Sequence, residues 1–302
     1  MVDELIKQLN NSFCSLEITP PKSTNLDEVL NSVSAIQKLG KIDAFVVTDN
    51  PLAKLKYSST LASIKVTQRF SKPVICTMSM RDKNKLALQS DLLGLNDFGV
   101  RAVLALTGDP ANISDQPNVK GVFCGNSIEL VRAIKFLSAG VDFAGKPLKH
   151  TPKPIYPFCV TNSYAKNFSN IKNKLHKKIE AGCTAIVSQP VFDVDGAKKL
   201  LDAFDEVRET FSDERANVKL IFGIFPITTL KTAQFLHAHV PGIQVPQAMI
   251  DRLFESSKIG SEEEKRVGIE MCKSLMDELR EINPRFHIMS ANKFDFIDEL
   301  LW

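Results

Sequence analysis

The feature that most constrains the fold of this chain is a regular alternation of short apolar runs and longer amphipathic segments, repeated about eight times. The apolar runs are rich in Val, Ile and Phe, and their length suits buried β-strands. The longer segments repeat apolar residues every three or four positions, as a helix with one buried face does. The predicted strands span residues 12–18, 43–48, 73–77, 102–107, 154–160, 184–188, 219–225 and 286–290. The predicted helices span residues 25–39, 55–70, 84–97, 128–139 (capped by Ser127), 170–181, 195–211, 229–238, 247–257, 261–282 and 294–301.

This alternation predicts a parallel sheet covered by helices, because successive parallel strands need a crossover connection that is usually helical. Eight such units predict an α/β fold of the closed (β/α)8 TIM barrel type, with residues 1–302 as a single catalytic domain. An open doubly wound sheet is the alternative. That fold usually carries a Gly-x-Gly-x-x-Gly turn after its first strand, whereas residues 17–21 read Glu-Ile-Thr-Pro-Pro.

Composition favours a globular protein over a nucleic-acid-binding or membrane protein. The chain has 302 residues, 44% of them hydrophobic and 24% charged, which is typical of a globular protein with a sizeable core. The net charge of +3 does not favour a nucleic-acid partner, and no apolar stretch approaches the length of a membrane-spanning helix. Six widely spaced cysteines lack metal-ligand spacing, and the N-terminus carries acids, so we expect no metal and a reduced, cytoplasmic protein.

Two predicted strands end at an acidic residue that is soon followed by proline. Glu17 precedes Pro20, and Asp109 precedes Pro110. An unpaired carboxylate is costly inside a strand, so both acids are expected at strand ends. Since the carboxyl ends of barrel strands meet at one mouth, we expect Glu17 and Asp109 to share one active site.

The remaining strand ends carry hydroxyl and amide side chains and, on these boundaries, no histidine. They include Thr48, Asn50, Asn162 and Gln189. Such a ring suits a large polar heteroaromatic ligand held by many hydrogen bonds, with one acid for proton transfer. The residues alone do not define the reaction.

At these positions the chain resembles the methylenetetrahydrofolate reductase family, in its bacterial form with the catalytic barrel only. Five motifs in the same order carry the resemblance, which covers nearly the whole chain. They lie at residues 13–21, 104–110, 178–189 (continued by Phe192 and Asp193), 223–227 and 242–246.

The resemblance implies reduction of 5,10-methylenetetrahydrofolate to 5-methyltetrahydrofolate, a step of one-carbon metabolism and methionine biosynthesis. NADH or NADPH would reduce a flavin (FAD, with FMN as the alternative), which then reduces the folate in a ping-pong mechanism. It implies Glu17 as general acid, Asp109 as a second catalytic residue beside flavin and pterin, and a homo-oligomer. Substrate contacts would come from Gln189, Asp109, Phe225 and Leu236. Flavin contacts would come from Thr48, Asn50, Arg81, Asp82, Thr107, Gly108, Asp109, Asn162 and Lys178.

Three segments depart from the family pattern: Thr107 replaces an arginine of some members, strand 73–77 lacks a histidine, and residues 161–165 lack a Pro-Glu-x-His. Two alternatives therefore stay open. One is a reductase that takes its electrons from a partner subunit, and the other is a flavin-less folate-binding subunit of a methyl-transfer complex. Single residues also have plainer interpretations. Asp109 would be a turn residue, Arg81 and Asp82 a surface ion pair, and Lys178 a solvated helix residue.

Overall fold

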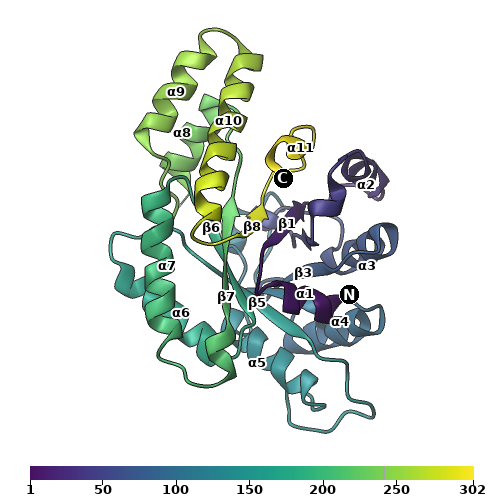
Figure 1. Cartoon of the computed structure of the whole chain (residues 1–302). Helices are drawn as coiled ribbons and strands as arrows, with labels where there is room; N and C mark the ends of the chain where they lie inside the picture. Colours follow the sequence, from purple (N-terminus) through teal and green to yellow (C-terminus); the bar gives the residue numbers. More distant parts are fainter. Residues whose placement is uncertain (241) are drawn as a thin grey trace.

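The computed structural model describes residues 1–240 and 242–302, and its central feature is a closed barrel of eight parallel strands in sequence order (Figure 1). The barrel closes where β1 pairs with β8. This confirms the predicted (β/α)8 barrel, and each strand end lies within about two residues of its predicted position. The strands are β1 (Phe13–Ile18), β2 (Ala44–Val47), β3 (Val74–Ser79), β4 (Ala102–Leu106), β5 (Tyr156–Thr161), β6 (Ala185–Pro190), β7 (Lys219–Ile224) and β8 (Arg285–Ile288).

The helices surround this barrel. They are α1 (Val2–Gln8), α2 (Asp27–Ser34), α3 (Ser59–Phe70), α4 (Lys85–Asp97), α5 (Ser127–Ser138), α6 (Phe168–Glu180), α7 (Val194–Arg208), α8 (Leu230–His239), α9 (Gln247–Ser257), α10 (Ser261–Arg280) and α11 (Ile297–Leu300). Short 3₁₀ turns occur at Leu39–Lys41, Pro51–Ala53, Ala111–Ile113 and Glu214–Asn217.

Several predicted helix ends were wrong for identifiable reasons. The α2 helix stops before residue 39, because the N–H groups of Gln37 and Lys38 donate to the Asp298 carboxylate instead of to helix carbonyls. The cap of α5 is Asn126, whose side chain accepts from the first-turn N–H groups, while Ser127 is already helical. Side-chain caps override the apolar periodicity at such ends.

The barrel interior is filled by side chains that point inward from alternate strand positions, such as Val46, Ile75 and Phe158. The α1 helix was not predicted, and it closes the N-terminal end of the barrel. Its residues Val2 and Leu5 are only 2% exposed and belong to this inner cluster. The barrel interior is therefore closed by side chains at that end.

An ion pair holds α1 in place. Both oxygens of the Asp3 carboxylate accept hydrogen bonds from the buried Arg101 guanidinium, and the Tyr156 hydroxyl donates to the same group. Hydrogen bonds from Arg101 and then Tyr156 hold the pKa of Asp3 well below its usual range. A lowered pKa means that the ionised carboxylate stabilises the folded state at neutral pH.

We expect Asp3→Asn to lower the free energy of unfolding at pH 7 by about 1 kcal/mol, the value of a charged hydrogen bond after discounting for partial exposure. The difference from wild type should be full above pH 4 and shrink as pH falls further, since the unfolded carboxylate then takes up its proton. Urea unfolding at several pH values measures both effects. Glu4→Gln, at an exposed position of the same helix, is the control. If wild type and Asp3→Asn still differ by the same free energy of unfolding at pH 2, this account is contradicted.

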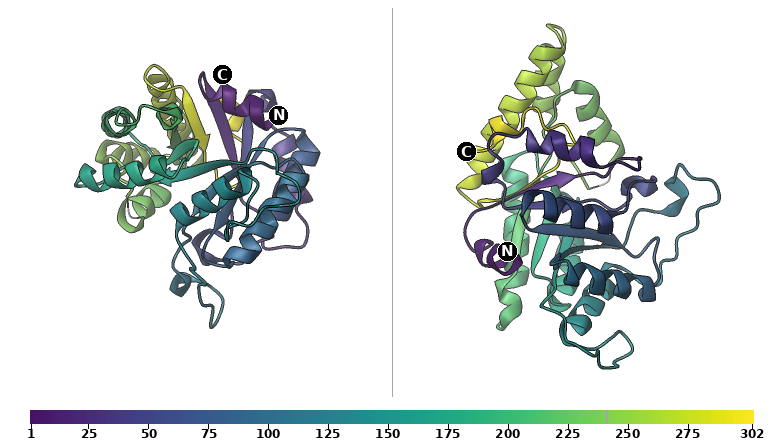
Figure 2. Two further views of the ribbon diagram at one scale, coloured as in Figure 1. Left: turned by 90° about the horizontal axis from the view of Figure 1, so that it is seen from below. Right: turned by 90° about the vertical axis from the view of Figure 1, so that its right-hand side faces the viewer.

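The β7–β8 connection contains three helices, α8, α9 and α10, which stand out together from the barrel (Figures 1 and 2). They share their own apolar cluster, which includes Phe192 and Leu236. Gly268 of α10 lies directly on the rim of the barrel. A Cβ atom at this position would lie 2.1 Å from the Ile227 carbonyl oxygen, so only glycine fits.

None of the helices described is both long and apolar enough to span a bilayer.

Candidate active site

A cavity of about 420 Å³ opens at the C-terminal mouth of the barrel. It draws side chains from β1 to β6 and from β8, from loops that follow these strands, and from α5 and α6. Residues at the carboxyl ends of barrel strands usually carry the chemistry of this fold. The lining includes these residues predicted for the site: Glu17, Thr48, Arg81, Thr107, Gly108, Asp109, Lys178 and Gln189.

Alternation along the strands explains why these side chains meet. Glu17 has the same parity as Phe13 and Ser15 on β1, and Gln189 has the same parity as Ala185 and Val187 on β6. Successive strand side chains point to opposite faces, so each polar residue ends a column of inward-pointing side chains. The last inward position of each strand is therefore the one that meets the cavity.

His287 lies beside Glu17, and the expectation of a mouth without histidine was wrong. Its Nε2 is 3.9 Å from Glu17 Oε2, and its Nδ1 is 3.0 Å from the Ser15 hydroxyl, the residue that it faces in the β1–β8 register. The imidazole is 4% exposed and Glu17 20%. The Ser15 hydroxyl also lies 3.4 Å from the Phe286 carbonyl, to which it donates. When Ser15 donates to this carbonyl, its oxygen is free to accept from an Nδ1–H of His287.

Asp109 ties two mouth loops together. Its Oδ2 accepts from the Leu52 N–H at 2.8 Å, and Ser114 Oγ donates to the Ala53 carbonyl at 2.7 Å. Asn50, Leu52 and Ala53 have φ values of 42°, 56° and 55°, in the left-handed region that costs a non-glycine residue of order 1 kcal/mol or more. The Asp109 carboxylate therefore holds a strained segment against the cavity, beyond what a simple turn residue does.

Arg81 is 2% exposed, so interpreting it as part of a surface ion pair was wrong. Its Nε and Nη2 donate to both oxygens of Asp82 at 2.7 and 2.5 Å, and Nη2 also donates to the Asn50 carbonyl at 3.2 Å. The bidentate contact lowers the pKa of Asp82 and raises that of Arg81. Only Arg81 faces the cavity. Asp82 and Asn50 lie behind it and fix its orientation.

Asp49 also lines the mouth, although it was not singled out from the sequence. Its Oδ2 accepts from the Ser79 N–H and hydroxyl, both at 3.1 Å, and its Oδ1 accepts from the Ser59 hydroxyl at 3.2 Å. Burial raises the pKa of this carboxyl, and Lys83 and the Ser79 hydrogen bonds partly oppose that. These contacts join the end of β2 to β3 and to α3.

Lys178 reaches from α6 into the mouth and is not a solvated helix residue. Its Nζ donates to the Val160 carbonyl of β5, and burial lowers its pKa. Among the cavity residues, the hydroxyls of Thr48 and Thr77 are buried and have no hydrogen-bond partner within residues 1–240 and 242–302. Buried polar groups are nearly always satisfied, so these two hydroxyls point to a ligand.

Besides Asn50 and Asp82, three further residues predicted for the site do not line this cavity. Leu236 is 8% exposed and packs in the α8–α10 cluster, against which Phe225 also lies. Asn162 packs against Gly242, where a Cβ atom would meet its side chain at 2.6 Å. Apolar periodicity cannot show that α8 turns its buried face toward two further helices instead of toward the mouth.

Comparison with known proteins gives three results. A sequence model of methylenetetrahydrofolate reductase matches residues 2–301. Methylenetetrahydrofolate reductase 2 of Schizosaccharomyces pombe is 24% identical over 301 residues, covering 93% of this chain and 44% of that protein. The 5,10-methylenetetrahydrofolate reductase of Buchnera aphidicola subsp. Baizongia pistaciae is 25% identical over 303 residues, covering 96% of this chain and 89% of that protein.

Among solved structures, a Clostridium thermocellum protein that binds two copies of 5-methyl-5,6,7,8-tetrahydrofolic acid superposes with a TM-score of 0.61. The two sequences are 17% identical, and the match covers 99% of each chain. EDTA monooxygenase from Chelativorans sp. BNC1 superposes with a TM-score of 0.57 at 11% identity, covering 96% of this chain and 92% of that chain. At these identities the likeness concerns the fold.

Proposed function

Because this chain belongs to the methylenetetrahydrofolate reductase family, we propose that it reduces 5,10-methylenetetrahydrofolate to 5-methyltetrahydrofolate with NAD(P)H through a bound flavin. Family membership agrees with the expected enzyme class. The S. pombe relative extends well beyond the length of this chain, so the proposal concerns the reaction of the barrel itself. The Clostridium protein, which binds a methylated tetrahydrofolate, supports a folate as the ligand.

One observation carries the proposal. A single cavity gathers Glu17, Asp109 and Gln189 from β1, the β4–α5 loop and β6, together with two buried hydroxyls that lack partners. An acid for proton transfer, an amide and a second carboxylate suit a pterin ring, which presents several N–H donors and ring acceptors. Positioned side chains of this kind perform proton transfer.

The same mouth fits a flavin. The orphaned hydroxyls of Thr48 and Thr77 would bond the polar edge of its ring system, and the buried Arg81 and Lys178 supply positive charge for its anionic groups. Gly108, at φ +97°, has no Cβ and so leaves room for the neighbouring Arg81 and Ser79 side chains. When bound, a flavin accepts a hydride from one substrate and donates it to the other.

The protein's own residues would supply the proton and the position. We assign Glu17 the role of protonating the bridge nitrogen that leaves when the methylene bridge opens to an iminium. His287 and Ser15 would act as positioning residues, since the imidazole lies 3.9 Å from the Glu17 carboxyl and its other nitrogen lies 3.0 Å from the serine hydroxyl. Gln189 and Asp109 would hold the pterin.

An anaerobic absorption titration of the purified protein tests the proposal. We expect a flavin absorption band at about 450 nm that bleaches on adding NADH or NADPH and recovers on adding 5,10-methylenetetrahydrofolate. A band that bleaches only when a partner protein is added would favour the partner-dependent alternative. A protein that stays colourless after incubation with FAD or FMN, yet binds folate, would overturn the flavin mechanism and favour the flavin-less alternative.

A further inference from the structure

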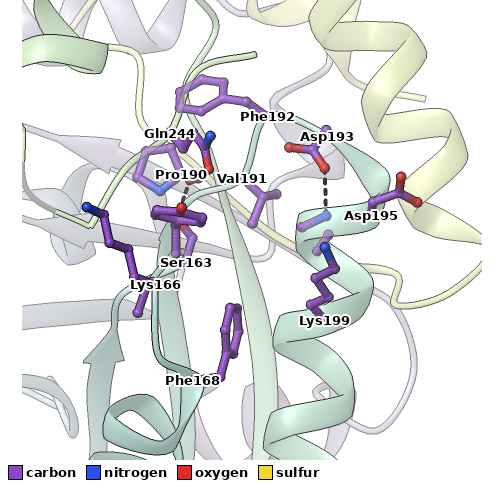
Figure 3. Close-up of a pocket in the computed structure, with 14 residues that line it drawn as sticks. Ser163, Lys166, Phe168, Pro190, Val191, Phe192, Asp193, Asp195, Lys199 and Gln244 are labelled. Carbon is purple, nitrogen blue, oxygen red and sulfur yellow. Dashed lines mark hydrogen bonds between the residues drawn. The ribbon is translucent and has the colours of Figure 1, made fainter.

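The mouth has polar wall atoms without partners, and they gather on one side of it. A second cavity, of about 340 Å³, lies beside the mouth between the β5–α6 loop and the start of α7 (Figure 3). Its buried hydroxyl, on Ser163, donates to the Pro190 carbonyl at 2.7 Å, so that wall needs no ligand. In the mouth, the hydroxyls of Thr48 and Thr77 find no partner among the residues that the structure describes. The unmet hydrogen bonds of the mouth therefore lie where β2 and β3 end.

The ladder between β2 and β3 stops just before these two threonines. Its last pair is Val47 with Cys76, although β3 stays paired with β4 beyond this point. One further pair would place Thr48 opposite Thr77, and both line the cavity. Opposed threonines on paired strands can hydrogen-bond to each other, and these two do not. The two strands thus part at the mouth, and we call this place (residues 48–50 and 77–79) the β2–β3 split.

The Asp49 carboxylate bridges the β2–β3 split. The Phe45 N–H donates to the Pro73 carbonyl, and the same alternation continued along the ladder would pair the Ser79 N–H with the backbone carbonyl of residue 49. The Ser79 N–H instead donates to the Asp49 side chain at 3.1 Å, and the Ser79 hydroxyl donates to the same oxygen. A carboxylate reaches farther from its backbone than a carbonyl does, so it satisfies this N–H while the two backbones stay apart.

Asp49 is itself held from behind the mouth. Its other oxygen accepts from the hydroxyl of Ser59, in the first turn of α3, at 3.2 Å. Ser59 is 2% exposed, and the N-terminal end of a helix favours a negative charge. Asn50, the next residue, has φ 42° and so leaves the extended conformation of the strand. The β2–β3 split is therefore formed before any ligand arrives, which lowers the entropic cost of binding.

We propose that Asp49 is a positioning residue, which keeps β2 and β3 apart so that the hydroxyls of Thr48 and Thr77 both bond the flavin. This inference rests on the proposed function, in which a flavin occupies the mouth. The ring system of a flavin has an edge of carbonyl and N–H groups, and a hydroxyl can donate to the former and accept from the latter. Asp49 acts through the backbone of β3 and needs no contact with the flavin.

A double-mutant cycle on flavin affinity tests the proposal. Apoprotein of the full chain is titrated with FAD and with FMN, followed by flavin fluorescence, for wild type, Asp49→Ala, Thr77→Val and the double variant. We expect each single change to weaken binding about tenfold, the effect of one or two lost hydrogen bonds. The double variant should bind like Asp49→Ala, because both changes remove the same contact. If Asp49→Ala does not fold, Asp49→Ser, whose hydroxyl is too short to reach Ser79, takes its place.

Two further variants separate positioning from a general loss of structure. Asp49→Asn keeps an oxygen that can accept from the Ser79 N–H, so it should bind flavin within about threefold of wild type. Ser59→Ala removes the contact behind the split and leaves both bonds from Ser79 in place. It should lower the midpoint of urea unfolding of the apoprotein and change flavin affinity by no more than about twofold.

The results that overturn this proposal differ from those that overturn the proposed reaction. If Asp49→Ala binds flavin as wild type does, or if its effect adds fully to that of Thr77→Val, Asp49 does not position the hydroxyls, and the flavin mechanism still stands. If Ser59→Ala weakens flavin binding as much as Asp49→Ala does, the cause is general destabilisation and the proposal also fails. If wild type binds neither FAD nor FMN, the flavin mechanism fails and the role of the β2–β3 split fails with it.

Discussion

Glu17→Gln is expected to lower the rate of 5,10-methylenetetrahydrofolate reduction by about 10³-fold while leaving NAD(P)H oxidation within about twofold of wild type. The amide keeps the size of the carboxyl but cannot donate an acidic proton, and a positioned general acid contributes about 10²–10⁴-fold. Stopped-flow measurement of the two half-reactions separates the effects. The half-reaction with NAD(P)H needs no proton on the folate, so it reports whether the mouth is intact.

A matched change at the neighbouring imidazole sharpens this test. His287→Gln retains a hydrogen-bonding side chain at a position 3.9 Å from the carboxylate, and it should reduce folate turnover less than Glu17→Gln does. Equal losses in both half-reactions of Glu17→Gln would instead show that the carboxylate supports the mouth and does not transfer a proton.

The second large effect is expected for Gly108→Ala. A Cβ atom at this position would lie 2.6 Å from the Arg81 Cβ and 3.2 Å from the Ser79 Cβ, and the backbone has φ +97°. The strain and the clash together should lower the free energy of unfolding by about 2–4 kcal/mol. Arg81 cannot stay in place beside the new methyl group, so flavin affinity should fall as well. Urea unfolding and flavin titration measure the two consequences.

Gly99→Ala is the control that separates strain from clash. Gly99 has φ +79°, but nothing lies within 4 Å of its would-be Cβ. This variant should lower the free energy of unfolding by only about 1 kcal/mol, because it carries the cost of the left-handed backbone alone. Its flavin titration should match that of wild type. If Gly108→Ala and Gly99→Ala lower the free energy of unfolding equally, the contact between Gly108 and Arg81 does not contribute to stability, which would contradict this account.

The sequence was sufficient to predict the barrel, because each of its eight units repeats the same two periodicities. It also predicted, for a physical reason, that Glu17 and Gln189 would lie at the mouth. Glu17 and Gln189 interrupt apolar strands at their carboxyl ends, where a polar side chain is tolerated only if it faces the mouth.

The misses have physical reasons too. His287 falls inside a predicted strand, and only its register opposite Ser15 reveals that it meets Glu17. Counting alternate positions back from Met289 would have indicated that it points inward. The α1 helix has seven residues and is too short to show a clear period of apolar residues. The placement of Leu236 depends on how α8 packs against α9 and α10, which is a tertiary choice that no local pattern records.

The contact between Gly268 and the Ile227 carbonyl has a consequence for how this sequence can diverge. Many positions of α10 are exposed to solvent, yet position 268 in this helix has no room for a side chain. Among the residues of α8, α9 and α10, Gly268 is therefore a position at which substitution is not tolerated. Replacing Gly268 by a larger residue would push α10 away from residues 227 and 228 at the rim of the barrel. A substitution far from the reacting groups would therefore still change the shape of the mouth.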